Sequence, residues 1–183
     1  MKMRKINKII ILIFVFIFFK IYFSFSQENQ SSENKGSLEN KNIKTYENKN
    51  YVFNYPDNWE LIENLADLDL ALINLQNPTS NIYIKTIKNN QKIEEYINNE
   101  IKKMKESLLE KFDILKNEKQ VIQDKEIYIL EYEFAQGTLN FKTLRYYIIK
   151  PNILYLLTYT NYKKDFENNL KDFYFIFNSF KIK

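Results

Sequence analysis

The chain has 183 residues with 27 basic and 23 acidic side chains, and it contains no histidine and no cysteine. These absences exclude Ser-His and Cys-His nucleophilic sites, thiol redox centres, and zinc or iron sites that use histidine. Residues 1–26 hold five basic side chains and no acid, so 27 minus 5 leaves 22 basic against 23 acidic residues and a net charge of −1 beyond them. Nucleic-acid binding requires a net basic face, so we expect no nucleic-acid partner.

The first 26 residues have the three parts of a secretory signal. Basic residues precede an apolar run from Ile9 to Phe19, Lys20 ends that run, and Ser24-Phe25-Ser26 supplies small residues for a signal peptidase. We therefore predict cleavage after Ser26 and a mature protein that is periplasmic or secreted. The alternative is an uncleaved segment that anchors the protein to the membrane, but spanning hydrocarbon takes about 20 apolar residues.

The next segment, residues 27–48, contains almost no apolar side chains. Such a composition is typical of a disordered polar tether. The remaining residues, 49–183, have the length of a normal single domain. The predicted organisation is therefore a signal peptide over 1–26, a tether over 27–48 and one folded domain over 49–183.

The domain is predicted to begin with a strand that ends at a proline. Residues 51–55 alternate aromatic with other side chains, and Pro56-Asp57-Asn58 has the residues of a turn. Trp59 then opens a second strand. We interpret Trp59 as a core-capping residue; the alternative makes Asp57, Asn58 and Trp59 a surface site for a partner or ligand.

Further strands are predicted over residues 68–75 and 81–87, followed by a long helix. Its apolar side chains recur at helical spacing and comprise Ile93, Ile97, Ile101, Met104, Leu108, Phe112 and Leu115. The charged residues between them, such as Glu100 and Lys103, are interpreted as a solvated face.

A hairpin is predicted next, with strands over 128–134 and 139–150. Gly137 supplies the positive φ that a tight turn needs, and pairing Phe134 with Leu139 places Glu131 opposite Lys142. The following run, residues 153–157, is apolar on both faces and predicts a central strand.

The last predicted helix starts near Tyr162, and its apolar stripe comprises Tyr162, Phe166, Leu170, Phe173, Tyr174 and Phe177. Its solvated side is predicted to hold Lys163, Lys164, Glu167, Lys171 and Asp172. The predicted fold class is α+β: a mostly antiparallel sheet of about six or more strands, with helices on both faces as an α/β/α sandwich.

Carboxylates are the remaining candidates for chemistry. Asp67 and Asp69 alternate along the chain, as do Glu131 and Glu133, and each pair shares a strand face at ~7 Å. That separation would suit a glycosidase pair, and the aspartates alternatively suit calcium. However, Lys142 is the expected partner of Glu131, and no loop has the ligand pattern of a calcium site. We therefore predict no catalytic residues, no metal site and no cofactor.

Three stretches resemble the PsbP, DcrB and Mog group of α/β/α sandwich proteins. They are "YPDNW" after an aromatic strand, "LRYYIIKPNILYLLTYT" and the closing "FENNLKDFYFIFNSFKI". The resemblance covers residues 50–183 in order. The chain has Gln123-Asp124-Lys125 where members often have a glycine, and it lacks the histidine that some photosynthetic members use.

The resemblance implies a binding or scaffolding domain rather than an enzyme, and the signal favours a bacterial envelope role. We predict a non-enzymatic envelope domain with a protein partner or a peptidoglycan-associated partner. The alternative, suggested by 15 phenylalanines and 14 tyrosines, is a carrier of an apolar small molecule or lipid.

Overall fold

The computed structural model describes residues 42–63, 65, 67–107 and 111–183, so the predicted signal and most of the predicted tether lie outside the described residues. The strands are β1 (Ile43–Glu47), β2 (Tyr51–Pro56), β3 (Trp59–Glu63), β4 (Leu70–Asn74), β5 (Asn81–Lys88), β6 (Lys111–Ile122), β7 (Lys125–Gln136), β8 (Leu139–Lys150), β9 (Ile153–Tyr162) and β10 (Lys181–Ile182). The helices are α2 (Ile93–Glu106), the 3₁₀-helix η2 (Lys163–Asn168) and α3 (Leu170–Ser179).

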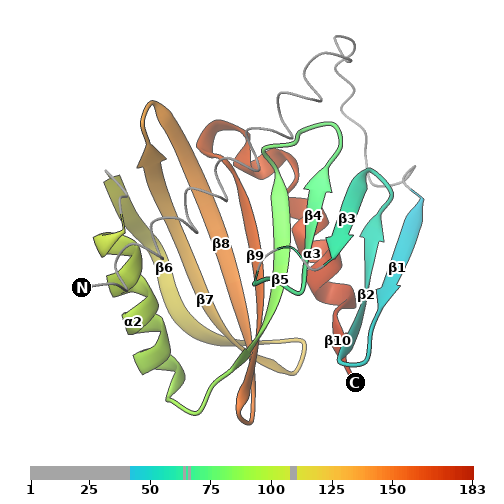
Figure 1. The fold of residues 1–183 in the computed structure, drawn as a ribbon, viewed down its shortest axis with the longest axis horizontal. Helices are drawn as coiled ribbons and strands as arrows, with labels where there is room; N and C mark the ends of the chain where they lie inside the picture. Colours follow the sequence, from blue (N-terminus) through green and yellow to red (C-terminus); the bar gives the residue numbers. More distant parts are fainter. Residues whose placement is uncertain (1–41, 64, 66, 108–110) are drawn as a thin grey trace. The chain divides into compact units, whose positions relative to one another are not determined.

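The strands form two sheets, and every described strand pairing is antiparallel. The larger sheet has seven strands in the order β3-β4-β5-β9-β8-β7-β6, and the smaller has three in the order β1-β2-β10 (Figure 1). β9 is the middle strand of the larger sheet and most of its side chains are buried. The predictions of a mostly antiparallel sheet and of a central strand after Pro151 are therefore confirmed.

Successive side chains of β7, β8 and β9 contribute to two separate hydrophobic clusters, as the period of two in a strand requires. The α3 cluster contains Tyr51, Phe53, Trp59, Leu70, Leu72, Ile82, Ile84, Ile127, Ile129, Leu144, Tyr146, Ile148, Tyr155, Leu157, Tyr159, Phe166, Phe173, Ile176, Phe177 and Phe180. The α2 cluster contains Ile93, Ile97, Ile101, Tyr128, Leu130, Tyr132, Tyr147, Leu154 and Leu156. Within the predicted hairpin strand 128–134, Tyr128, Leu130 and Tyr132 belong to the α2 cluster.

The break at Pro56 moves the chain from one sheet to the other. β2 lies in the three-stranded sheet, and β3, which starts at Trp59, lies at one edge of the seven-stranded sheet. Pro56 is the last residue of β2, in agreement with the predicted strand end. The short turn therefore forms a corner between the sheets and not a hairpin within one of them.

The ordered domain begins earlier than predicted. Residues 43–47 form β1, which pairs with β2 in a register that places Tyr46 opposite Phe53. The prediction of a disordered tether up to Asn48 is wrong for these residues. Their polar composition is explained by their position, because β1 is an edge strand and its side chains are mostly exposed.

The helix predicted from Ile93 to Leu115 is shorter in the structure, and a strand that the sequence analysis did not predict follows it. α2 ends at Glu106, and residues 111–122 form β6, the other edge of the larger sheet. Phe112 and Leu115 therefore lie in a strand, while Leu108 lies outside the described residues. A register shift between Ile114 and Lys116 leaves Leu115 as the extra residue of a bulge, and this interrupts the alternation that would have indicated a strand.

The hairpin of β7 and β8 forms as predicted but in another register. Gly137 has φ +58° at the turn, yet Gln136 pairs with Leu139 and Phe134 pairs with Phe141. Because the shift is two residues, each side chain keeps its face of the sheet. Glu131 lies opposite Leu144, and its ion pair with Lys142, at 2.7 Å, is diagonal.

The closing helix begins later than predicted. β9 continues to Tyr162, η2 follows, and the α-helix starts only at Leu170. Phe173 and Phe177 are fully buried, as the apolar stripe predicts, and Tyr174 is 40% exposed.

Candidate functional site

Residues 57–59, the predicted candidate site, are held in place by hydrogen bonds to other parts of the chain. The backbone N–H of Asp57 donates to the Asn42 carbonyl at 2.8 Å, and the Asn58 carbonyl accepts from Leu75 at 2.9 Å. The Trp59 side chain is 0% exposed. The geometry brings Asp57, Asn58 and Trp59 together as a structural corner, and it gives Trp59 no surface with which to stack on a ligand.

The hydrogen-bond partner of Trp59 is a buried acid. The indole Nε1–H donates to Oδ2 of Asp172 on α3 at 2.9 Å. Asp172 is 0% exposed, so its predicted place on the solvated face of the closing helix is wrong. The pair links the corner to α3 and supports a structural role for both residues.

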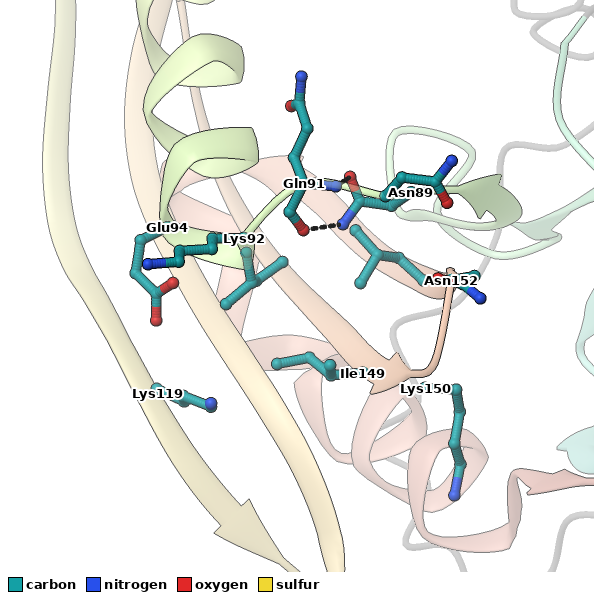
Figure 2. Close-up of a pocket in the computed structure, with 11 residues that line it drawn as sticks. Asn89, Gln91, Lys92, Glu94, Lys119, Ile149, Lys150 and Asn152 are labelled. Atoms are coloured by element: carbon teal, nitrogen blue, oxygen red, sulfur yellow. Dashed lines mark hydrogen bonds between the residues drawn. The ribbon is translucent and has the colours of Figure 1, made fainter.

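A pocket of about 330 Å³ lies at the start of α2. The loop from β5 supplies Asn89 and Gln91, α2 supplies Ile93, and the facing strands supply Lys119 and Ile149. Figure 2 shows Ile149 between Lys119 and Lys150. The pocket joins residues from α2, β6, β8 and β9, which no local pattern in the sequence brings together.

Hydrogen bonds within two turns shape this pocket. The Asn89 side chain donates to the Gln91 carbonyl at 2.8 Å and accepts from the Gln91 N–H at 3.3 Å (Figure 2). The Asn89 N–H donates to the Asn152 carbonyl at 3.0 Å, and Asn152 has φ +60°. Asparagine tolerates this left-handed conformation. The hydrogen bond between Asn89 and Asn152 connects the β8–β9 turn to the loop that leads into α2.

The charges around the pocket are mostly positive. Lys92, Lys119 and Lys150 line it together with one acid, Glu94. Lys119 forms an ion pair with Glu126 on β7, while Lys92 and Lys150 make no ion pair with another described residue. The described lining of this recess combines lysines and amide groups with apolar side chains such as Ile93 and Ile149, and it singles out no catalytic group.

A second pocket, of about 740 Å³, lies beside the β7–β8 turn. It is lined by Thr138, Leu139, Asn140, Tyr162, Lys163 and Lys164. Leu139 is 46% exposed there. The lining of this pocket therefore combines apolar surface with polar and charged side chains.

The four carboxylates that the sequence analysis considered for catalysis each form a hydrogen bond or an ion pair within the fold. Asp69 accepts from the backbone N–H and the hydroxyl of Thr86 at 3.0 and 2.6 Å, and Asp67 pairs with Lys85. Glu131 pairs with Lys142 at 2.7 Å, and Glu133 pairs with Lys163 at 2.6 Å.

No group of three or more His, Cys, Asp or Glu side chains in the part of the chain that the structure describes could hold a metal ion. No described helix is long and apolar enough to cross a membrane.

Comparison with known proteins identifies one family. The PsbP family model matches residues 41–182, nearly the whole described domain. No curated protein matches the chain.

Two solved structures have a similar fold. The solution structure of cyanobacterial PsbP (CyanoP) from Synechocystis sp. PCC 6803 superposes with a TM-score of 0.61 and 12% identity, covering 82% of this chain and 98% of that chain. The crystal structure of LpqN, involved in cell envelope biogenesis of Mycobacterium tuberculosis, superposes with a TM-score of 0.56 and 10% identity, covering 80% and 87%. At these identities the similarity concerns the fold.

Proposed function

Because the chain belongs to the PsbP family, we propose that it is a non-enzymatic binding or scaffold domain that works outside the cytoplasm, associated with the cell envelope. The observation that carries the proposal is the family match over residues 41–182. The signal-like N-terminus supports the location, as does the similar fold of LpqN, a protein of envelope biogenesis.

The residue chemistry supports a non-enzymatic role. The chain has no histidine or cysteine, and Asp67, Asp69, Glu131 and Glu133 each have a partner within the fold. A general acid or base must instead reach its substrate directly. We propose that these four carboxylates stabilise the sheet.

We further propose that the domain is an α/β/α sandwich. The α2 and α3 clusters, which take alternate side chains of β7–β9, support this architecture. Cluster membership therefore also identifies the side chains available to a partner: those that belong to neither cluster and remain exposed.

Crosslinking in the native cell tests the binding role. Photo-crosslinking amino acids would be placed singly at exposed apolar positions, which are Ile43, Leu75, Leu115, Val121, Leu139 and Tyr174. A scaffold domain should give one defined crosslinked protein from neighbouring positions and none from the others. A uniform background at all six positions would contradict the proposal.

The location is tested separately by the intact mass of the protein from the envelope fraction. Cleavage after Ser26 gives a chain that starts at Gln27. A chain that retains Met1 in the cytosolic fraction would contradict an extracytoplasmic role.

The two pockets favour the alternative of an apolar carrier only weakly, since lysine side chains line both of them. Native mass spectrometry of the purified protein should therefore show no bound lipid. A lipid adduct at constant stoichiometry would favour the carrier instead.

A further inference from the structure

Arg145 on β8 is a positive charge that has no acidic partner among the described residues. The side chain is half-buried, and no described carboxylate lies within salt-bridge distance of it. Its guanidinium lies over the Tyr132 ring at 5.4 Å, donates to the Tyr83 hydroxyl at 3.1 Å and contacts the Tyr147 hydroxyl at 3.5 Å. Three tyrosines from three strands therefore surround the charge.

Tyr132 and Tyr147 do not neutralise Arg145. Burial raises the pKa of Tyr147 to about 12, and burial also raises the pKa of Tyr132. Both phenols therefore keep their protons at neutral pH and offer hydrogen bonds without negative charge. Partial burial of a cation without a counter-ion costs free energy, and a bound anion would lower this cost.

A second polar group beside Arg145 is also incomplete. Thr158 on β9 lies directly opposite Arg145 and also directly opposite Tyr83 on β5, and directly paired residues share one face of a sheet. Thr158 is 0% exposed, and its Oγ1 has no hydrogen-bond partner. Nε of Arg145 is likewise buried and without a partner.

Nε of Arg145 and Oγ1 of Thr158 lie on one row of the sheet, and both could bond to a group that accepts hydrogen bonds. Buried polar atoms in native proteins are nearly always hydrogen-bonded. A carboxylate matches this row, because it is planar, accepts two parallel N–H bonds from a guanidinium and accepts a hydroxyl proton from threonine.

We propose that Arg145 and Thr158 form a binding site for a carboxylate group. The two unpaired atoms are closed to solvent, whereas the side chains of Arg145 and Tyr83 are partly exposed. The ligand therefore enters past Tyr83 and displaces its hydroxyl from the guanidinium. This site is separate from both pockets and does not depend on the scaffold role.

The test follows the arginine Nε–H signals of the full ¹⁵N-labelled chain by NMR. The sequence has two arginines, Arg4 and Arg145, so the signal lost in Arg145→Lys is that of Arg145. Acetate should shift it saturably, whereas acetamide, the neutral analogue, and sodium chloride at equal ionic strength should not. A shift equal to that in sodium chloride would overturn the proposal and leave a buried water as the occupant of the row.

Variants locate the binding. Thr158→Val keeps the shape of the side chain but removes the hydroxyl, so it should weaken acetate binding about tenfold, the effect of a hydrogen bond to a charged group. The matched control is Thr160→Val, which removes a hydroxyl from the same strand face that is bonded to Thr143 at 3.0 Å. Equal weakening by both variants would overturn the assignment. Backbone amide spectra identify any variant that does not fold; in that case Thr158→Ser, which keeps the hydroxyl, should bind like the parent, and a loss of binding there would also overturn the site.

The source of the carboxylate is distinguished by a further pair of probes, N-acetyl-trialanine with a free or an amidated C-terminus. Tighter binding of the free peptide than of acetate would support a protein C-terminus as ligand. Acetate binding without peptide binding would support a small organic acid. Equal binding of the free and amidated peptides would overturn the need for a carboxylate.

Discussion

Two places in the domain differ in how their polar groups are satisfied, one around Trp59 and Tyr159 in the α3 cluster and one around Arg145 beside the α2 cluster. In the α3 cluster, Trp59 bonds to Asp172 at 2.9 Å and the Tyr159 hydroxyl donates to the Phe166 carbonyl at 2.7 Å. Beside the α2 cluster, Arg145 has no described acidic partner and Thr158 has no hydrogen-bond partner. The bonds of Trp59 and Tyr159 stabilise the α3 side, and the carboxylate site proposed above would give the polar groups on the α2 side a ligand to bind.

The strongest test of the α3 side is Trp59→Ala. Because Trp59 is 0% exposed, the cavity should lower the free energy of unfolding by ~3–5 kcal/mol, measured by urea denaturation. Glu60→Ala, at the exposed neighbouring residue, should stay within ~0.5 kcal/mol. The parent's fluorescence comes from this one tryptophan, and strong iodide quenching of it would contradict the buried corner.

The α2 side is tested by alkaline titration. The pKa of Tyr147 is raised to about 12 by burial, so the folded protein holds this proton while an unfolded chain releases it near pH ~10. The stabilisation is complete below pH ~10 and is lost as the pH rises towards 12, amounting to about 2–3 kcal/mol. Tyr147→Phe should flatten this part of the stability–pH curve, and an unchanged curve would show that Tyr147 is not the cause.

Asp172→Ala tests the hydrogen bond between the corner and α3. The substitution leaves the Trp59 N–H without its acceptor, and we expect a loss of ~1–3 kcal/mol in chemical denaturation. Asp172→Asn keeps an acceptor oxygen and should cost less. A double-mutant cycle combines Asp172→Ala with Trp59→Phe. If the losses of the two single variants add up to the loss of the double variant, the hydrogen bond contributes nothing.

Gly137→Ala should have the smallest effect and concern neither cluster. Its φ is +58°, and nothing lies within 4 Å of an added Cβ, so the cost is backbone strain alone, about 1 kcal/mol. Gly137→Asn should lower the melting temperature less, because asparagine tolerates this conformation. Equal melting temperatures for the alanine variant and the parent would contradict the strained turn.

Sequence patterns predicted the elements whose signals are local. The alternation in β2 and β7 and the apolar run in β9 follow from which side chains each face buries. The pattern failed at residues 107–115, where Phe112 and Leu115 continue the helical spacing although α2 ends at Glu106. At such lengths, apolar spacing alone does not separate a helix from a bulged strand.

The site residues depend on contacts between distant parts of the chain. Asp172 was predicted to be solvated because charged residues are rarely buried without a partner, and its partner Trp59 is 113 positions away. The pocket at α2 and the row through Arg145 each join three or more elements. The spacing of apolar residues along one sequence does not show which distant residues come into contact.

The three-stranded sheet has a consequence for the order of folding. β2 is flanked by β1, its near neighbour in sequence, and by β10, where Lys181 pairs with Val52. This sheet is therefore completed only after residues 181–182 have emerged from the ribosome or the export channel. Closing so long a loop is slow, so the three-stranded sheet is expected to be completed late in folding.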